Sequence, residues 1–437
     1  MGGDSNDPVV IIGAGPVGLA AAAHMLGRGL EPIVLEASTQ VGASLRDWGH
    51  VRLFSPWRYN IDKACAALLE ASGWAAPPAD ALPTGGDLFE QYLRPLAALP
   101  EIAGRLRLDQ KVVGISRQEA DKVKTRGRGD SPFVVRAMDS EGVITERLAR
   151  AVLDASGTWW SPNPLGAAGL PAQGEDELGD RLHYGIPDIG GEHRSRYAGR
   201  TTLVVGAGHS AANSILALAE LAQSAPGTKI IWATRGTNLT RVFGGGSGDA
   251  LAARGQIGET LQAMIRSEQL TLLSGFRINA VRPDGTSIKV MGTREGRPFS
   301  RSGIDAIIAA TGQRPALDLL REVRLSLDPS LECVSALAPL IDPNEHSCGT
   351  VRPHGQRELA HPDPDFYIVG SKSYGRAPTF LLATGYEQVR SVAAMLAGDE
   401  TAALRVELDL PQTGVCSSDL TPVEADTKCC GPAPRCC

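Results

Sequence analysis

Residues 8–36 constrain the fold of this chain more than any other stretch. An apolar run, Val9 to Ile12, leads into Gly13-Ala14-Gly15-Pro16-Val17-Gly18, and an alanine-rich segment follows. A second apolar run then ends on Glu36. This order predicts a strand, a glycine turn, a helix, a second strand and an acid at its tip.

Each glycine has a physical role in such a turn. Gly13 permits the tight turn out of the strand, Gly15 lets the backbone approach a pyrophosphate, and Gly18 lets the helix pack on the sheet. The helix start, at Pro16, offers free N–H groups and partial positive charge to phosphates. Glu36 is placed to accept hydrogen bonds from ribose hydroxyls, so the stretch predicts a dinucleotide site.

A second stretch repeats the pattern. After Thr202 and the apolar residues 203–205 come Gly206, Gly208 and, at the third glycine position, Ala211. The next predicted strand, 229–234, ends on Thr234 and Arg235 instead of an acid. An arginine there suits the 2′-phosphate of NADP, whereas an acid would suit NAD. A solvated loop cation is the alternative interpretation of Arg235.

The 437-residue length and 43% hydrophobic content allow two domains and a tail. Apolar runs end in small residues at Ser156-Gly157 and again at Thr311-Gly312, and we interpret these as two crossings between domains. The predicted fold is α/β, with two Rossmann-like dinucleotide-binding domains, the second inserted into a discontinuous first. The expected boundaries are 8–165 and 305–398 for the first domain, 198–304 for the second, and 399–437 for a flexible Cys-rich tail.

Local signals add three further elements. Asp87 is predicted to be the N-cap of a helix over residues 88–99, and residues 283–286 predict a hairpin turn. A helix is also expected over residues 381–396.

Composition excludes several partners. The net charge of −6 and the lack of a basic block argue against nucleic acid, and no apolar run suits a membrane span. We expect a cytoplasmic protein. The motif Leu-Pro-Gln-Thr-Gly at 410–414 has the form of a cell-wall sorting signal, but no apolar segment and basic residues follow it, so we interpret it as a coincidence.

Cysteines gather near the C-terminus. Of the eight cysteines, those after residue 415 are Cys416, Cys429, Cys430, Cys436 and Cys437. The last four form two vicinal pairs beside Lys428 and Arg435, whose charges would favour thiolates that exchange electrons or bind soft metals. The alternative is that these cysteines are incidental. A looser group, Cys333, His346, Cys348 and His354, fits a structural or substrate-facing loop better than a zinc site.

Together these motifs resemble the two-dinucleotide-binding-domain flavoproteins, which include thioredoxin reductases and flavin-containing monooxygenases. The resemblance spans roughly residues 8–398 and implies FAD in the first site and NADPH in the second. The residues expected to contact these cofactors are Gly13, Gly15, Pro16, Gly18, Glu36, Ser44, Trp48, Val113, Ser156, Gly206, Gly208, Ser210, Ala211, Thr234, Arg235, Thr311, Gly312, Gly370 and Thr379.

Differences between this chain and the disulfide reductases indicate which branch of the superfamily it resembles. Disulfide reductases have a close cysteine pair beside the flavin, whereas Cys65 stands alone and no close pair occurs before residue 429. Where reductases have Gly-Asp, this chain has Gly370-Ser371, and the segment onward to Arg390 looks more like the monooxygenases. The monooxygenase signature FxGxxxHxxx is absent from residues 182–188. The pattern is also similar to bacterial flavoproteins associated with arsenic resistance.

The leading hypothesis is an NADPH-dependent FAD oxidoreductase that passes electrons to O₂ and a small soft-atom or metalloid substrate. One alternative is a thiol, disulfide or metalloid reductase in which Cys429, Cys430, Cys436 and Cys437 exchange electrons and bind metal. Another is a metal(loid)-binding flavoprotein with little turnover. Asn213 is a further candidate catalytic residue, with helix packing as its alternative role, and a homodimer is a candidate assembly.

Overall fold

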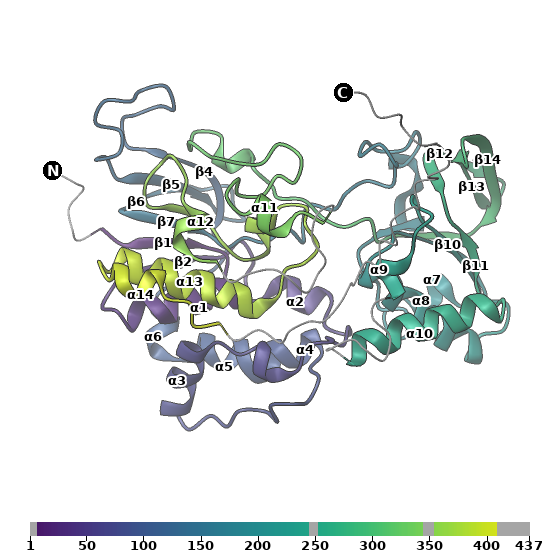
Figure 1. The fold of residues 1–437 in the computed structure, drawn as a ribbon, viewed down its shortest axis with the longest axis horizontal. Helices are drawn as coiled ribbons and strands as arrows, with labels where there is room; N and C mark the ends of the chain where they lie inside the picture. Colours follow the sequence, from purple (N-terminus) through teal and green to yellow (C-terminus); the bar gives the residue numbers. More distant parts are fainter. Residues whose placement is uncertain (1–6, 244–251, 344–353, 409–437) are drawn as a thin grey trace, which may run out of the picture.

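The protein has two lobes joined by two segments of chain (Figure 1). The computed structural model describes residues 7–243, 252–343 and 354–408. The first lobe, on the left of Figure 1, contains both ends of the described chain, and the second lobe is built from its middle. This arrangement agrees with the predicted insertion of one nucleotide-binding domain into another.

The first lobe is organised around a parallel sheet with strand order β16-β7-β1-β2-β3. Its strands are β1 (Val9–Ile12), β2 (Pro32–Leu35), β3 (Leu106–Arg107), β7 (Ala151–Asp154) and β16 (Phe366–Ile368). The central strand β1 pairs with β2 and β7, and Val9, Val10 and Ile11 are fully buried. Continuous apolar runs of this kind are expected where helices and other elements cover both faces of a sheet.

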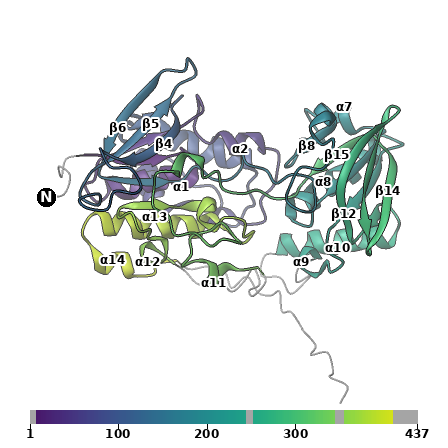
Figure 2. The same cartoon turned by 90° about the horizontal axis from the view of Figure 1, so that it is seen from above.

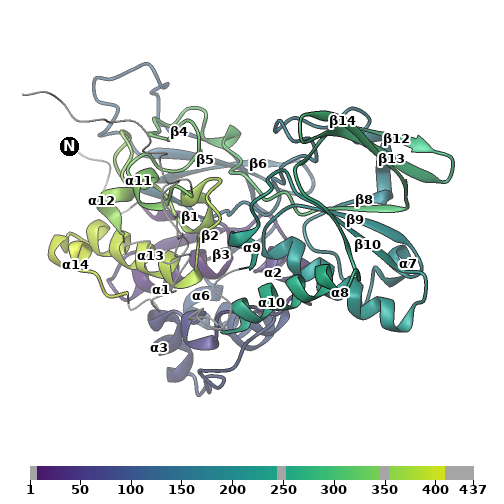
Figure 3. The same cartoon turned by 45° about the vertical axis from the view of Figure 1, so that its right-hand side comes forward.

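Helices α1 (Pro16–Leu26) and α13 (Leu382–Leu396) lie side by side against this sheet (Figures 1 and 3). A Cβ on Gly385 of α13 would lie 2.7 Å from the Val17 side chain of α1, so glycine permits their close approach. The lobe's other helices are α2 (Ala43–Asp47), η1 (Trp57–Tyr59), α3 (Lys63–Ala71), α4 (Gly85–Leu88), η2 (Phe89–Leu93), α5 (Arg94–Ala98), α6 (Pro100–Ala103), η5 (Asp318–Leu320), α11 (Ala338–Ile341), α12 (Gln356–Leu359), η6 (Gly370–Tyr374) and α14 (Glu400–Leu404).

The predicted N-cap at Asp87 is wrong. Helix α4 begins at Gly85, three residues before the predicted start, and Thr84 is its N-cap, with the Thr84 hydroxyl accepting from the Asp87 N–H at 3.0 Å. Asp87 is the third helical residue, and its carboxylate accepts from the Thr84 N–H at 2.9 Å. This is a capping box, in which a Thr and an acid three residues later satisfy each other's backbone N–H groups.

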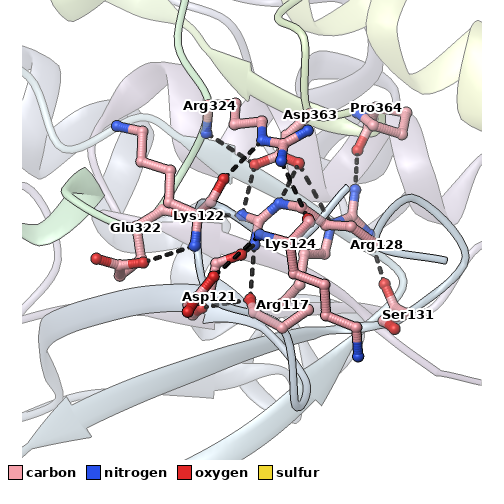
Figure 4. Close-up of polar contacts among 12 residues, drawn as sticks. Arg117, Asp121, Lys122, Lys124, Arg128, Ser131, Glu322, Arg324, Asp363 and Pro364 are labelled. Carbon is pink, nitrogen blue, oxygen red and sulfur yellow. Dashed lines mark hydrogen bonds and ion pairs between the residues drawn. The ribbon is translucent and has the colours of Figure 1, made fainter. Parts of the chain in front are cut away.

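A three-stranded antiparallel sheet of β4 (Lys111–Arg117), β5 (Phe133–Met138) and β6 (Ile144–Ala149) packs on the first lobe (Figure 2). The loop between β4 and β5 is fixed by the buried Arg128, which donates to both carboxylate oxygens of Asp363 at 3.1 and 2.9 Å (Figure 4). Asp363 also accepts from the Arg324 N–H at 2.8 Å. These bonds tie the loop to the segment that leads into β16.

The second lobe has a parallel sheet in the order β11-β10-β9-β15-β8. Its strands are β8 (Leu182–Tyr184), β9 (Thr201–Val205), β10 (Lys229–Ala233), β11 (Thr271–Leu273) and β15 (Ala306–Ala309). The sheet therefore extends on both sides of the expected range 198–304. Figure 3 shows helices on one side of it, namely α7 (Arg194–Tyr197), α8 (His209–Ser224), α9 (Thr240–Phe243) and α10 (Ala252–Arg266), with η3 (Asp176–Arg181) as a further short helix of this lobe.

An antiparallel meander covers the other face of the second sheet (Figure 3). It consists of β12 (Phe276–Asp284), β13 (Ser287–Arg294) and β14 (Arg297–Ile304). The turn between β12 and β13, with Gly285 at φ +63°, confirms the hairpin predicted at residues 283–286.

The two crossing segments pair with each other. The first follows β7 and the second follows β15, as the small residues after each apolar run predicted. The Asn163 N–H donates to the Gly312 carbonyl at 2.9 Å, and the Thr311 hydroxyl donates to the Asn163 carbonyl at 2.6 Å. The lobes are thus joined by a short two-stranded connection and not by two independent linkers. In the described part of the chain, no helix is both long and apolar enough to cross a membrane.

Candidate functional site

The first glycine loop is shaped by contact with β7. Gly13 has φ +97°, and a Cβ there would lie 2.9 Å from the Ala155 carbonyl oxygen. A Cβ on Gly18 would lie 1.9 Å from the Gly13 carbonyl oxygen, which no side chain could tolerate. These two positions therefore require glycine, one for its backbone conformation and both for close packing.

Gly15 differs from these two, because no atom lies within 4 Å of the position of its Cβ. Gly15 is the N-cap of α1 and has no side-chain cap, so the first N–H groups of the helix have no capping side chain. The open space beside Gly15 and the helix start together form a cradle that suits a pyrophosphate. The residues at this loop therefore fit the dinucleotide cofactor that the sequence predicts.

Glu36 lies next to this loop. Its carboxylate accepts hydrogen bonds from the Ala14 N–H at 2.7 Å and from the Ser38 N–H at 2.9 Å. These bonds fix the acid at the end of β2 and use one lone pair on each oxygen, so the remaining lone pairs can accept from ribose hydroxyls.

A buried ion pair lies near the first glycine loop. Lys372 of η6 donates to Asp154, the last residue of β7, at 2.7 Å and to the Ser156 hydroxyl at 3.1 Å. Both charged side chains are fully buried. Asp154 also accepts from the Ser156 N–H and hydroxyl, at 3.1 and 2.6 Å. Ser156, itself exposed, is thus held against Gly13 by a charged network.

Gly370 joins the same edge of the sheet. It has φ +69°, and its N–H donates to the Gln388 side chain at 2.7 Å. A Cβ at this position would touch Val17, at 3.4 Å. Gly13, Gly15, Gly18, Ser156 and Gly370, which lie far apart in the sequence, therefore meet around the start of α1.

The second glycine loop has the same construction. Gly206 has φ +139°, and a Cβ there would lie 2.1 Å from the Ala310 carbonyl oxygen, whereas the space beside Gly208 is open. Ala211 is fully buried at the third position. The buried Trp232 donates its indole N–H to the Gly206 carbonyl at 2.7 Å and so fixes the turn.

The residues at the tip of β10 point in different directions. Thr234 is buried, and its hydroxyl donates to the Gly236 carbonyl at 2.9 Å. Arg235 is exposed and donates to the Ala167 carbonyl at 3.2 Å, a bond that leaves most of its guanidinium donors for other partners.

Other predicted site residues are more dispersed. Ser44 lies on α2, and Trp48 caps that helix with its ring over Gly85. Ser210 and the half-buried Asn213 lie on the first two turns of α8. The remaining two are Val113 on β4, with 39% of its surface exposed, and Thr379, whose buried hydroxyl has no hydrogen-bond partner among the described residues.

The lobes meet close to both loops. The Ala14 carbonyl of the first loop accepts from the N–H of Gly42, the N-cap of α2, at 3.0 Å. Phe54 of the first lobe packs on His209, the first residue of α8, with ring centroids 5.0 Å apart. Trp159, in the first crossing segment, donates its indole N–H to Asp47 of α2 at 2.6 Å. A Cβ on Gly185, just after β8, would lie 3.3 Å from the Trp159 ring, so this indole lies between the two lobes.

A pocket of about 410 Å³ opens between the lobes at this contact. It is lined from the first lobe by Ala43, Arg46, Asp47 and His50, from the crossing segment by Trp160, and from the second lobe by His183, Ile186, Asp188, Glu192 and His193. Burial lowers the pKa of His183 to about 4 and also lowers the pKa of His50. Both imidazoles are therefore neutral at pH 7.

The described cysteines do not lie at this junction. Cys65 on α3 is fully buried, and burial raises its pKa well above the ordinary value. Burial likewise raises the pKa of Cys333 to about 12. His354 accepts from the Gln388 amide at 2.9 Å, and no group of three His, Cys, Asp or Glu in the described ranges is spaced to hold a metal ion. His346, Cys348, Cys416, Cys429, Cys430, Cys436 and Cys437 lie outside the described residues.

Sequence reasoning missed two groups of residues. One is the pair of Asp154 and Lys372, for which the only signal was a charged residue at the end of a buried apolar run. The other is the set of titratable residues in the interlobe pocket. Its two halves are more than a hundred residues apart in the chain, so no local pattern could have joined them.

Comparison with known proteins gives a family and several structures of the same fold. The family model described as pyridine nucleotide-disulphide oxidoreductase matches residues 10–336. No protein with curated function matches the chain.

Three similar solved structures illustrate the range of chemistries on this fold. A bacillithiol disulfide reductase from Bacillus cereus is 17% identical, with a TM-score of 0.65 over 90% of this chain and 99% of that chain. The FAD-bound cadaverine monooxygenase of desferrioxamine biosynthesis from Erwinia amylovora is 16% identical, with a TM-score of 0.63 over 94% and 99%. A thioredoxin reductase from Lactococcus lactis is 14% identical, with a TM-score of 0.56 over 91% and 99%. At these identities the likeness shows the fold alone.

Proposed function

Because this chain belongs to the pyridine nucleotide-disulphide oxidoreductase family, we propose that it is an NADPH-dependent, monooxygenase-like flavoenzyme. It is a flavoprotein oxidoreductase, and the residues at its two glycine loops fit FAD and NADPH. The finer proposal is that O₂ accepts the electrons and that one oxygen atom goes to a small soft-atom or metalloid substrate. The other oxygen atom leaves as water, with NADPH and a proton as the reductant.

The observation that supports this proposal best is the convergence of both loops on one interlobe junction. Phe54 contacts His209 at the start of α8, and the pocket is lined from both lobes. When bound, FAD would supply the redox chemistry by accepting a hydride from NADPH and passing two electrons onward. The chain's own contribution is to orient the two dinucleotides and to provide a site for the acceptor.

Each loop has a separate task in this proposal. The open space at Gly15 and the first N–H groups of α1 hold the flavin's pyrophosphate, while Glu36 orients its adenosine ribose. Gly208 and the start of α8 do the same for NADPH, and Arg235 recognises its 2′-phosphate. Ser156, fixed by Asp154 and Lys372, closes the wall beside Gly13.

The state of the described cysteines favours O₂ over an internal disulfide as the electron acceptor. Thiol–disulfide exchange requires an accessible thiolate, but Cys65 and Cys333 are buried and their pKa values are raised. Exchange at the flavin would therefore have to use cysteines outside the described residues.

Cysteines outside the described residues give a second candidate function. The pairs Cys429-Cys430 and Cys436-Cys437 could accept electrons from the flavin and pass them to a disulfide or a metalloid. In this reading the tail, and not O₂, determines turnover. Any link to arsenic chemistry also rests on these soft thiolates.

The test compares the full-length protein with a variant in which all four of these cysteines are serine, and Cys416→Ser is the matched control. NADPH oxidation and O₂ consumption are recorded in air, and NADPH oxidation is recorded anaerobically with disulfide or arsenate. The proposal predicts that all three proteins oxidise NADPH at the same rate and consume O₂ at the same rate. Anaerobic turnover that the four-serine variant alone loses would replace it with the reductase function.

A further inference from the structure

The interlobe pocket contains more carboxylates than cations. Asp47, Asp188 and Glu192 line it, and Arg46 is the one guanidinium among its described lining residues. The Arg46 guanidinium is hydrogen-bonded to Gln40 and lies 5.4 Å from the centroid of the Phe89 ring, so both contacts hold it on the first-lobe side of the pocket. Arg196 acts on His183 electrostatically but does not line the cavity.

The His183 and His50 imidazoles do not compensate for this negative charge. Burial is the main cause of the low pKa of His183, and the nearby His193, His50 and Arg196 add to it, against the opposing charge of Asp47. Burial also dominates at His50, although Asp188 and the Pro187 carbonyl favour its charged form. At pH 7 these two rings are neutral hydrogen-bonding groups, and the carboxylates set the sign of the pocket.

Two of these carboxylates, Asp47 and Asp188, are held in place by hydrogen bonds. Asp188 accepts from the Gly191 and Glu192 N–H groups at 3.0 and 3.2 Å, and Asp47 accepts from the Trp159 indole at 2.6 Å. Asp47 comes from the first lobe and Asp188 from the second, so a bound cation would contact both lobes. Trp160 adds an indole with 68% of its surface exposed, and an indole face attracts cations.

We propose that this pocket binds a small organic cation, an ammonium or guanidinium compound. Its charge lies among Asp47, Asp188 and Glu192, and its carbon chain lies against Trp160, Ile186 and Ala43. A metal ion is not the occupant, because the described histidines and acids lack the spacing for one. This binding does not depend on the proposed oxygen chemistry.

The experiment uses the full-length protein without NADPH and three probes of similar size, which are 1,4-diaminobutane, 1,4-butanediol and succinate. Binding is followed by tryptophan fluorescence and by isothermal titration calorimetry. We expect saturable binding of the diamine alone, weakened by added salt because the attraction is between charges.

The variant Glu192→Gln removes one carboxylate whose side chain is exposed, so the fold should be kept. We expect it to weaken diamine binding by about threefold to tenfold, and Asp47→Asn to do the same from the other lobe. The matched control is Glu70→Gln, an exposed acid on α3 that does not line the pocket.

Two results would overturn the proposal. One is that the diol or succinate binds as tightly as the diamine, and the other is that Glu192→Gln and Asp47→Asn bind the diamine like the parent protein. NADPH and O₂ consumption with and without diamine are measured separately. Binding without any change in consumption would uphold the cation site and count against a substrate role for the diamine.

Discussion

Replacing Lys372 by methionine tests whether the buried ion pair of Lys372 and Asp154 stabilises the part of the first lobe beside the first glycine loop. The Lys372 ammonium lies 2.7 Å from Asp154, and neither side chain is exposed. The substitution would leave the Asp154 carboxylate buried. Its remaining hydrogen-bond donors would be the backbone N–H and the hydroxyl of Ser156. Removing one member of a buried pair typically costs about 3–5 kcal/mol, and the retained Ser156 bonds favour the lower end, about 3 kcal/mol.

The double variant Asp154→Asn/Lys372→Met removes both charges with little change in shape. Because no uncompensated charge is then buried, we expect it to recover at least half of the free energy of unfolding lost in Lys372→Met. The control Lys63→Met changes an exposed lysine at the start of α3 and should stay within about 0.5 kcal/mol of the parent.

The assay is equilibrium urea unfolding followed by circular dichroism, with FAD retention measured on the same samples by gel filtration. We expect Lys372→Met to lose stability and to retain less FAD, since Ser156 would lose part of its support. The reasoning is refuted if Lys372→Met costs less than about 1 kcal/mol, or if the double variant is no more stable than Lys372→Met.

Three further predictions concern other parts of the molecule. Gly15→Ala should leave unfolding unchanged, because its Cβ meets no protein atom, yet lower FAD affinity at least about tenfold in a fluorescence titration; equal affinity would mean that the cofactor does not approach this loop. Arg235→Gln should raise KM for NADPH about tenfold with little change for NADH, and equal changes for both would point to a solvent-exposed cation without a cofactor role. Burial opposes the charge of Asp363, but hydrogen bonds from Arg128 and Arg324 outweigh it and hold its pKa below 3.8. Its contribution to stability should therefore be full above the unfolded-state pKa and be lost as pH falls through the lower folded-state value. Asp363→Asn should lose about 3 kcal/mol at pH 7 and show a flatter acid profile in urea unfolding, and an unchanged profile would contradict this assignment.

The sequence was most informative where a local conformation fixes the residue type. Gly13, Gly18 and Gly206 could be identified because a positive φ or a close backbone contact excludes any side chain, and such requirements recur at a fixed spacing. The crossings were predictable for a similar reason, since small residues end each buried run. The start of α4 was predicted at the wrong residue because both Thr84 and Asp87 are suitable caps, and only the geometry of the capping box assigns their positions.

The sequence alone could not predict which distant charged residues pair with each other. Asp154 and Lys372 are separated by 218 positions, and they meet only because β16 returns beside β7 and carries η6 to the end of that strand. The pocket likewise depends on how α2 faces β8 across the crossing segments. By itself the sequence determined two dinucleotide loops, because their chemistry lies within about thirty consecutive residues. The tertiary structure alone decided which charges are buried together and what lines the space between the lobes, because electrostatic partners are set by chain topology and not by neighbouring sequence.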